Sequence, residues 1–442
     1  MALSLSLFSC NKAEMNQTDR STNTQKKATS IIDYEESNDH VYESDGDYEG
    51  GSVGSNADDG YESDTVPGNQ ETKTPSPTPP AANPASPSLG AANQTPAPTP
   101  EPAPAPAEVG TLKPGGWNLT FRHLDPSSIG LTNEGMDFGI AKALNSVSQV
   151  AEVRKVPPLE GGLSYSIDPN DFGFTANQKQ AIQNCSHLRK TDIDGTSFME
   201  ADTFMYCILE PRIYYRLMNI QNAGNMELAV ERRYLRTQRS VQNRQVVCVR
   251  KSDVANGADR MMERIQRPDG GVFWGTADYL NRANGAAAIN SGTFPPSNSN
   301  RVNLLKAGEF MWEMPNGFIG YALSGFGAQA RFEANRQVAS DPGRNDQYVI
   351  AGYGCFACHT SGFNTGNWIP CGQGPNATFP DAQGFAQLIQ KDNTRFLAAM
   401  KKMGTSDEII QGPEPITAII KNFESRTGTA FQPAGATGAI GF

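Results

Sequence analysis

Cys355, Cys358 and His359 stand within five consecutive positions, in the word Cys-Phe-Ala-Cys-His. The whole chain of 442 residues has only 7 cysteines and 4 histidines, so their meeting by chance is a poor explanation. Two thiols at this spacing can each add to one vinyl group of a haem, and the adjacent histidine can then bind the iron. The word therefore predicts one covalent haem c, with Cys355 and Cys358 as thioether positions and His359 as an axial ligand.

Three other chemistries fit parts of the same word. A zinc site needs a fourth ligand, for which Cys371 is nearest, but adjacent residues such as Cys358 and His359 seldom bind one tetrahedral ion. A thioredoxin-like redox pair needs its first cysteine at a helix N-terminus after a strand, whereas the segment before Cys355 has a helical pattern. A structural disulfide is the third alternative.

The second axial ligand of such a haem would decide much of its function. A methionine raises the reduction potential and suits electron transfer, whereas an open position permits ligand binding or peroxide chemistry. Met400 and Met403 follow the motif at a suitable separation, and we take either as the candidate ligand. They also share one helical face with Phe396 and Leu397, which is the ordinary pattern of a buried helix. The remaining candidates are His123, His187 and Met314.

The first ten residues, ending in Leu-Phe-Ser-Cys, resemble the end of a bacterial lipoprotein signal. In such a signal Cys10 would become the lipid-bearing N-terminus, although this sequence lacks the positive start of a complete export signal. Export agrees with thioether attachment, which takes place outside the cytoplasm. We therefore predict a lipoprotein held at the bacterial outer membrane, in the periplasm or on the cell surface.

Residues 11–109 predict a disordered tether. Its first part, 30–65, contains twelve acidic residues and no lysine or arginine, which is too polar to bury a core. Its second part, 75–106, contains twelve prolines and favours an extended spacer. A merely solubilising tail is the alternative.

Charge argues against a nucleic acid partner, and hydropathy argues against a membrane-spanning helix. The net charge of -10 is more than accounted for by the acidic tether, and the basic residues elsewhere are scattered. Nucleic acid binding needs clustered positive charge, so we expect no nucleic acid partner. No run of about 18 apolar residues exists, so contact with a membrane would have to come through the lipid anchor.

Residues 110–345 predict a mostly helical domain of uncharacterised type. Helical periodicity occurs at 136–150, 211–220 and 226–240. Strand patterns are fewer, with a β-branched run at 244–250 and a hairpin near 308–325 that turns at Pro315-Asn316-Gly317.

Residues 346–442 predict a cytochrome c-like helical haem domain. A helix over 345–354 would lead into the motif, and terminal helices would follow at 382–390, 392–404 and 415–425. Asp392 would cap the second of these and Gly404 would end it, while Pro415 suits the first turn of the last. The expected fold class is therefore mainly α with a small β component.

The other cysteines agree with an oxidising compartment. Assigning Cys10 to the lipid and two cysteines to haem leaves an even number, which permits two disulfides or none. The pairing is open, and the four cysteines are Cys185, Cys207, Cys248 and Cys371.

Several longer words resemble a family of exported bacterial lipoproteins, of planctomycete and myxobacterial type, whose function is uncharacterised. These words include "YSIDPNDFGF" at Tyr165, "ADTFMYCILEPRIYYRLM" at Ala201, "GEFMWEMPNGFIGYAL" at Gly308 and "CFACHTSGF" at Cys355. The resemblance covers nearly all of residues 130–425. It implies a single haem on Cys355, Cys358 and His359, held within one folded unit and not in a free-standing cytochrome domain. It implies no activity, and the Arg-His pair usual after the "NR" word is missing at Arg244.

These observations favour an electron carrier with an unknown redox partner protein. The first alternative is an envelope oxidoreductase in which 110–345 binds substrate and the haem relays electrons. Against an enzyme, the sequence contains no nucleotide-binding glycine word, Ser-His-Asp set or second metal cluster. The second alternative is a surface-interaction lipoprotein.

Overall fold

The computed structural model describes residues 108–220, 244–252, 258–267, 270–278, 308–324, 330–334, 339–341, 344, 347–364, 368–369 and 382–431. The predicted signal at 1–10, nearly all of the predicted tether and the predicted helix at 226–240 lie outside these ranges. Within them, no helix combines the length and apolar character that crossing a membrane requires.

The first part of the described chain forms a four-stranded sheet in the order β2-β1-β4-β3. β1 pairs antiparallel with β2 and parallel with β4, while β3 and β4 form an antiparallel pair. The strands are β1 (Trp117–Thr120), β2 (Ser164–Ile167), β3 (Lys190–Ile193) and β4 (Thr196–Glu200).

A seven-stranded antiparallel sheet, in the order β10-β9-β8-β7-β6-β5-β11, follows. Its strands are β5 (Arg244–Ser252), β6 (Ala258–Gln266), β7 (Val272–Asp278), β8 (Gly308–Glu313), β9 (Ile319–Ser324), β10 (Ala330–Arg331) and β11 (Trp368–Ile369). The prediction of a mainly α fold with a small β component is therefore wrong, and so is a cytochrome c-like helical C-terminal domain. β11, which follows the motif, belongs to this sheet.

The predicted strands at 244–250 and in the hairpin near 308–325 are confirmed as β5, β8 and β9. β6 was missed because charged residues occupy buried positions along it. Arg260, Glu263 and Arg264 are each at most 7% exposed, so the strand lacks the alternation of apolar and polar residues that identifies a half-buried strand. Arg260 lies beside Glu309 and Arg264 pairs with Asp392, and no local pattern reveals partners so distant in sequence.

Helices surround the four-stranded sheet. Their bounds are α1 (Asn133–Val147), α2 (Ala176–Gln183), α3 (Ala201–Leu209) and α4 (Pro211–Leu217), with short 3-10 turns η1 (Pro126–Ile129) and η2 (Pro169–Phe172). Thr132 caps α1 by accepting a hydrogen bond from the Gly135 amide. The predicted helices at 136–150 and 211–220 are thus confirmed to within a few residues.

α4 connects the two sheets. The hydroxyl oxygens of Tyr214 and Tyr215 accept hydrogen bonds from the backbone amides of Tyr321 and Leu323, both at 2.9 Å. Tyr321 and Leu323 lie in β9. These hydrogen bonds give backbone amides of β9 partners on the side chains of α4, which fixes the position of β9.

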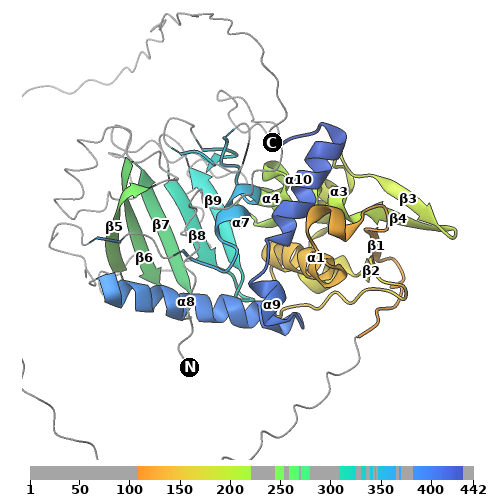
Figure 1. The fold of residues 1–442 in the computed structure, drawn as a ribbon, viewed down its shortest axis with the longest axis horizontal. Helices are drawn as coiled ribbons and strands as arrows, with labels where there is room; N and C mark the ends of the chain where they lie inside the picture. The colour runs from red at the N-terminus through yellow and green to blue at the C-terminus, as the bar shows by residue number, and fades with distance from the viewer. Residues whose placement is uncertain are drawn as a thin grey trace, which may run out of the picture. The chain divides into compact units, whose positions relative to one another are not determined.

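α8 (Ala382–Lys402) runs along the large sheet as one helix (Figure 1). Two helices were predicted here, with Asp392 as a cap. Asp392 instead lies inside α8, where its carboxylate accepts hydrogen bonds from Arg264 at 2.6 and 2.8 Å and from Trp274 at 3.2 Å. An aspartate that looks like a helix start is thus the buried partner of a strand arginine.

Two further helices complete the described chain. α9 (Asp407–Ile410) is a single turn, and α10 (Pro415–Thr427) begins at Pro415 as predicted. Gly139 of α1 allows close approach of α10, because a Cβ there would lie 3.0 Å from the Ile419 side chain. One hydrophobic core includes residues from both sides of position 345, among them Phe204, Met311, Cys355 and Ile419.

Candidate functional site

The Cys-x-x-Cys-His word is carried by a short helix, α7 (Tyr353–Cys358), which lies between β9 and α10 (Figure 1). The helix predicted over 345–354 is wrong. Ile350 instead forms a β-bridge with Glu333, and the helix begins only after Gly352. Gly352 has φ +77, and a Cβ there would lie 3.1 Å from the Tyr214 ring, so this position favours glycine.

α7 places the two cysteines one turn apart, as their spacing requires. Both carry thiols. Cys355 is 2% exposed, whereas Cys358 is partly exposed. Burial, helped by the negative charge of Glu309, raises the pKa of the Cys355 thiol well above its usual value. Cys355 is therefore a protonated thiol at neutral pH and a poor nucleophile for redox catalysis.

His359 follows α7 directly, and its Nδ1 atom has a defined partner. Its Nδ1 lies 3.1 Å from the Gly362 carbonyl oxygen, which can only accept, so Nδ1 donates. Nε2 is the ring nitrogen that remains for another partner, and Glu309 is the residue beside it. Histidines that bind metals commonly donate their other ring nitrogen to a carbonyl in this way.

The loop after His359 is held by α8. The Asn393 side chain accepts a hydrogen bond from the Phe363 amide at 2.7 Å and donates one to the Phe363 carbonyl at 2.8 Å. Gly362 has φ +114, and a Cβ there would lie 2.3 Å from Asn393 Oδ1. The carbonyl that orients His359 therefore depends on a glycine.

The Nε2 side of His359 faces the large sheet. Glu309 Oε1 lies 3.7 Å from Nε2, and Arg260 Nη1 lies 3.8 Å from Glu309 Oε2. The Tyr321 ring is 5.7 Å from the imidazole. Burial would raise the pKa of Glu309, but His359 and Arg260 outweigh it and hold that pKa below its usual value. Glu309, Arg260 and Tyr321 were not predicted as site residues, although the glutamate within the apolar strand word "GEFMW" was a usable signal.

The donor set fits a covalent haem in its chemistry. Two thiols sit one helical turn apart, and the adjacent imidazole has its Nδ1 engaged and its Nε2 turned outward from the loop. A group bound at Nε2 would displace Glu309 from its present place, because Oε1 lies on that side of the ring. Glu309 and Tyr321 would then be neighbours of the bound group.

The predicted second ligands lie in α8 and at its end. Met400 is fully buried in the core, and Met403 is 8% exposed, with its sulfur 3.6 Å from the amide nitrogen of Asn145. Both stay predictions as iron ligands. Among the other candidates, Met314 is buried beside the β8–β9 turn, His187 contacts the Tyr206 ring edge-on at 5.1 Å and His123 contacts Asp202.

Disulfides involve the other described cysteines. Cys185 and Cys207 form one, and Cys248 is also disulfide-bonded. The partner of Cys248 lies outside the described residues, as do Cys371 and Cys10. Disulfides are typical of oxidising compartments.

A separate groove of about 610 Å³ lies beside α2 and α4. Its lining is both polar and apolar, and its polar residues include Gln180, Asn184, Arg212 and Arg216. The Cys185 residue of the disulfide stands at its edge.

Comparisons with protein-family models, with curated proteins and with solved structures find no match to this chain.

Proposed function

We propose that this chain is a c-type haem protein that transfers electrons in the bacterial cell envelope. Cys355 and Cys358 would hold one haem through thioether bonds, and His359 Nε2 would bind the iron. Lipid on Cys10 would attach the protein to a membrane, and residues 11–109 would act as its tether. The redox partner would be another protein, and no nucleic acid is involved.

The orientation of His359 carries this proposal. A metal-binding histidine commonly donates a hydrogen bond from its other ring nitrogen to a carbonyl oxygen. Here the Gly362 carbonyl fixes Nδ1 as the donor at 3.1 Å, next to two thiols at the spacing that haem attachment needs. The disulfides support export, because thioether attachment and disulfide formation both belong outside the cytoplasm.

When bound, the haem would supply a one-electron redox centre. The protein's own residues determine its setting. Tyr321 and Phe356, whose rings are 5.4 Å apart, form an apolar wall beside the motif. Buried surroundings and the nearby carboxylate of Glu309 would both affect the reduction potential.

The test is to express the exported full-length chain together with a haem-maturation system. The expected result is haem that stays attached on a denaturing gel, together with visible spectra that change on reduction. Cys355→Ser with Cys358→Ser should abolish the attachment. A colourless, iron-free wild-type protein would overturn the proposal.

The second axial ligand is tested separately. Met400→Ala or Met403→Ala should convert the haem to a form that binds carbon monoxide, if the missing sulfur was the ligand. Met136→Ala is the matched control, because Met136 is an equally buried methionine on α1. A six-coordinate spectrum in both methionine variants would exclude both residues as ligands.

The groove beside α2 and α4 favours an envelope oxidoreductase as a second candidate. Amide and guanidinium groups and the carboxylate of Glu210 line it, and such groups suit a hydroxylated small substrate. An oxidoreductase should reduce its haem when such a substrate is added, and Arg212→Ala should slow that reduction. A haem that responds only to protein redox partners would favour the carrier.

A further inference from the structure

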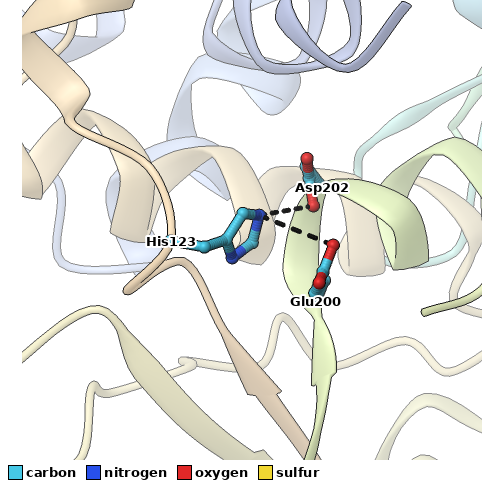
Figure 2. A group of neighbouring side chains, drawn as sticks. All are labelled: His123, Glu200 and Asp202. Atoms are coloured by element: carbon cyan, nitrogen blue, oxygen red, sulfur yellow. Dashed lines mark hydrogen bonds and ion pairs between the residues drawn. The ribbon is translucent and has the colours of Figure 1, made fainter. Parts of the chain in front are cut away.

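A second cluster of metal-binding side chains lies beside the four-stranded sheet. His123 follows β1, Glu200 ends β4 and Asp202 stands in the first turn of α3 (Figure 2). The His123 Nε2 atom lies 3.0 Å from Asp202 Oδ1 and 3.9 Å from Glu200 Oε2. One imidazole nitrogen and two carboxylate oxygens therefore all lie within 4.8 Å of one another.

Asp202 is buried, Glu200 is half-buried and His123 is an exposed residue, so the cluster opens to solvent at the imidazole. The side chain of Asp202 is 0% exposed, that of Glu200 is 17% exposed and that of His123 is 23% exposed. Glu200 Oε2 is withdrawn from solvent and accepts no hydrogen bond. Burying a carboxylate oxygen without a donor is costly, and a bound ion is one of the recognised explanations for such an atom.

We propose that His123, Glu200 and Asp202 form a binding site for a divalent transition-metal ion of the zinc class. Tetrahedral coordination with bonds of about 2.0–2.1 Å separates neighbouring ligand atoms by roughly 3.4 Å. The two distances from His123 Nε2, 3.0 and 3.9 Å, lie on either side of that value. Nitrogen and carboxylate oxygen are ligands that zinc accepts. The fourth position is left for water or an external ligand.

Arg426 of α10 offers the competing explanation, an ion-pair network without metal. Its Nη2 lies 2.6 Å from Asp202 Oδ2 and 3.8 Å from Glu200 Oε2. The guanidinium thus engages the oxygen of Asp202 that faces away from His123, and it leaves Glu200 Oε2 without a hydrogen bond. His123 Nε2 lies within hydrogen-bond distance of Asp202 Oδ1, and a metal ion would take the place of the proton between them. A divalent cation between Oδ1, Oε2 and Nε2 would also give the orphaned Glu200 oxygen a partner.

Such an ion would connect the end of β1 to the β4–α3 junction. It would also orient Asp202 toward Arg426 of α10 and so link the two segments to that helix. α10 in turn packs against α3 and α7. The site therefore stabilises the fold, and its occupancy does not depend on haem.

The experiment is a zinc titration of the full-length, chelator-treated protein by calorimetry. His123→Ala and Glu200→Gln should each remove one equivalent of zinc or weaken its binding at least tenfold. His187→Ala is the matched control, because this histidine contacts Tyr206 outside the cluster and its loss should change nothing. Zinc should also raise the melting temperature of the wild type but not of the two variants.

The thiols of α7 are a second place where zinc could bind, so the titrations are repeated in the Cys355→Ser/Cys358→Ser background. In that background the protein with an intact cluster should still bind one equivalent of zinc, and His123→Ala should still remove it. Cobalt bound at this site should show no sulfur-to-metal charge-transfer band. If Glu200→Gln, His123→Ala and wild type bind equal zinc with equal affinity in that background, the cluster is an ion-pair network and the proposal fails. The haem proposal is unaffected by either result.

Discussion

Lys142 of α1 and Glu414, the N-cap of α10, form an ion pair almost wholly withdrawn from solvent, with side chains 1% and 6% exposed. Lys142 Nζ also donates a hydrogen bond to the Thr360 carbonyl oxygen at 3.1 Å. Thr360 follows His359 directly. One buried ammonium group therefore holds together α1, the start of α10 and the loop that orients the imidazole.

Replacing Lys142 by Met should destabilise the protein strongly. The change leaves the Glu414 carboxylate buried without its partner, which costs about 3–5 kcal/mol in comparable pairs. Denaturant unfolding of the full-length chain measures the loss. Lys113→Met is the control, since the Lys113–Asp171 pair is exposed and such pairs contribute about 0–1 kcal/mol. Equal losses in the two variants would contradict a special role for Lys142.

Gly362→Ala should disturb the motif more than its backbone conformation alone predicts. The new Cβ would meet Asn393 Oδ1 at 2.3 Å, which must break the hydrogen bonds that hold Phe363. We expect a loss of about 2–4 kcal/mol in the free energy of unfolding, composed of backbone strain and broken hydrogen bonds. Gel staining for attached haem should show reduced incorporation.

Gly428→Ala separates the cost of backbone strain from the cost of the broken hydrogen bonds. Gly428 also has a positive φ, +66, but a Cβ there meets nothing within 4 Å. This variant should lose only about 1 kcal/mol, the cost of placing alanine in the left-handed region. Similar losses at Gly362 and Gly428 would mean that the Asn393 contact is unimportant.

Local sequence patterns were sufficient for elements whose stabilising contacts are local. Pro315-Asn316-Gly317 turns the β8–β9 hairpin and Pro415 begins α10, and both were predicted. Strands β5, β8 and β9 of the large sheet were predicted, but the sheet as a whole was not, because β6 carries buried charges whose partners are distant. Arg264 meets Asp392 across 128 positions, and this one pairing hid a strand and divided a helix in the prediction.

The candidate site likewise combines residues that a local pattern predicts with residues that only the fold brings together. The spacing of Cys355, Cys358 and His359 is a local signal, and the chain places all three at α7. Glu309 and Arg260 reach His359 only because β8 and β6 lie in the same sheet. His123, Glu200 and Asp202 likewise come together through the parallel pairing of β1 with β4, which joins segments separated by two helices.

The two motif cysteines should differ in reactivity when no haem is attached. Cys355 is buried and its pKa is raised, whereas Cys358 is partly exposed. Because the thiolate is the reactive form, iodoacetamide should modify Cys358 at least tenfold faster than Cys355. Peptide mass spectrometry of the haem-free chain at neutral pH gives both rates. In denaturant the two rates should become similar, and a persistent difference there would show that burial is not the cause.

Asp137 should make stability depend on pH in the direction opposite to most carboxylates. Burial raises its pKa above the ordinary 3.8, and the nearby charge of Glu134 adds to this, although the Tyr165 hydroxyl, at 2.6 Å, opposes it. The folded protein therefore binds this proton more tightly than the unfolded chain. Its contribution to stability is complete below the unfolded pKa and is lost as pH rises through the folded pKa.

The matched variant is Asp137→Asn, which keeps an acceptor for Tyr165 and does not ionise. Relative to this variant, the wild type should lose stability as pH rises from about 3 to above the folded pKa, and the difference should then stay constant. Denaturant unfolding of both proteins at several pH values measures it. A difference that is flat, or that grows in favour of wild type with rising pH, would show that Asp137 is stabilised as a carboxylate, with the Tyr165 hydrogen bond outweighing burial.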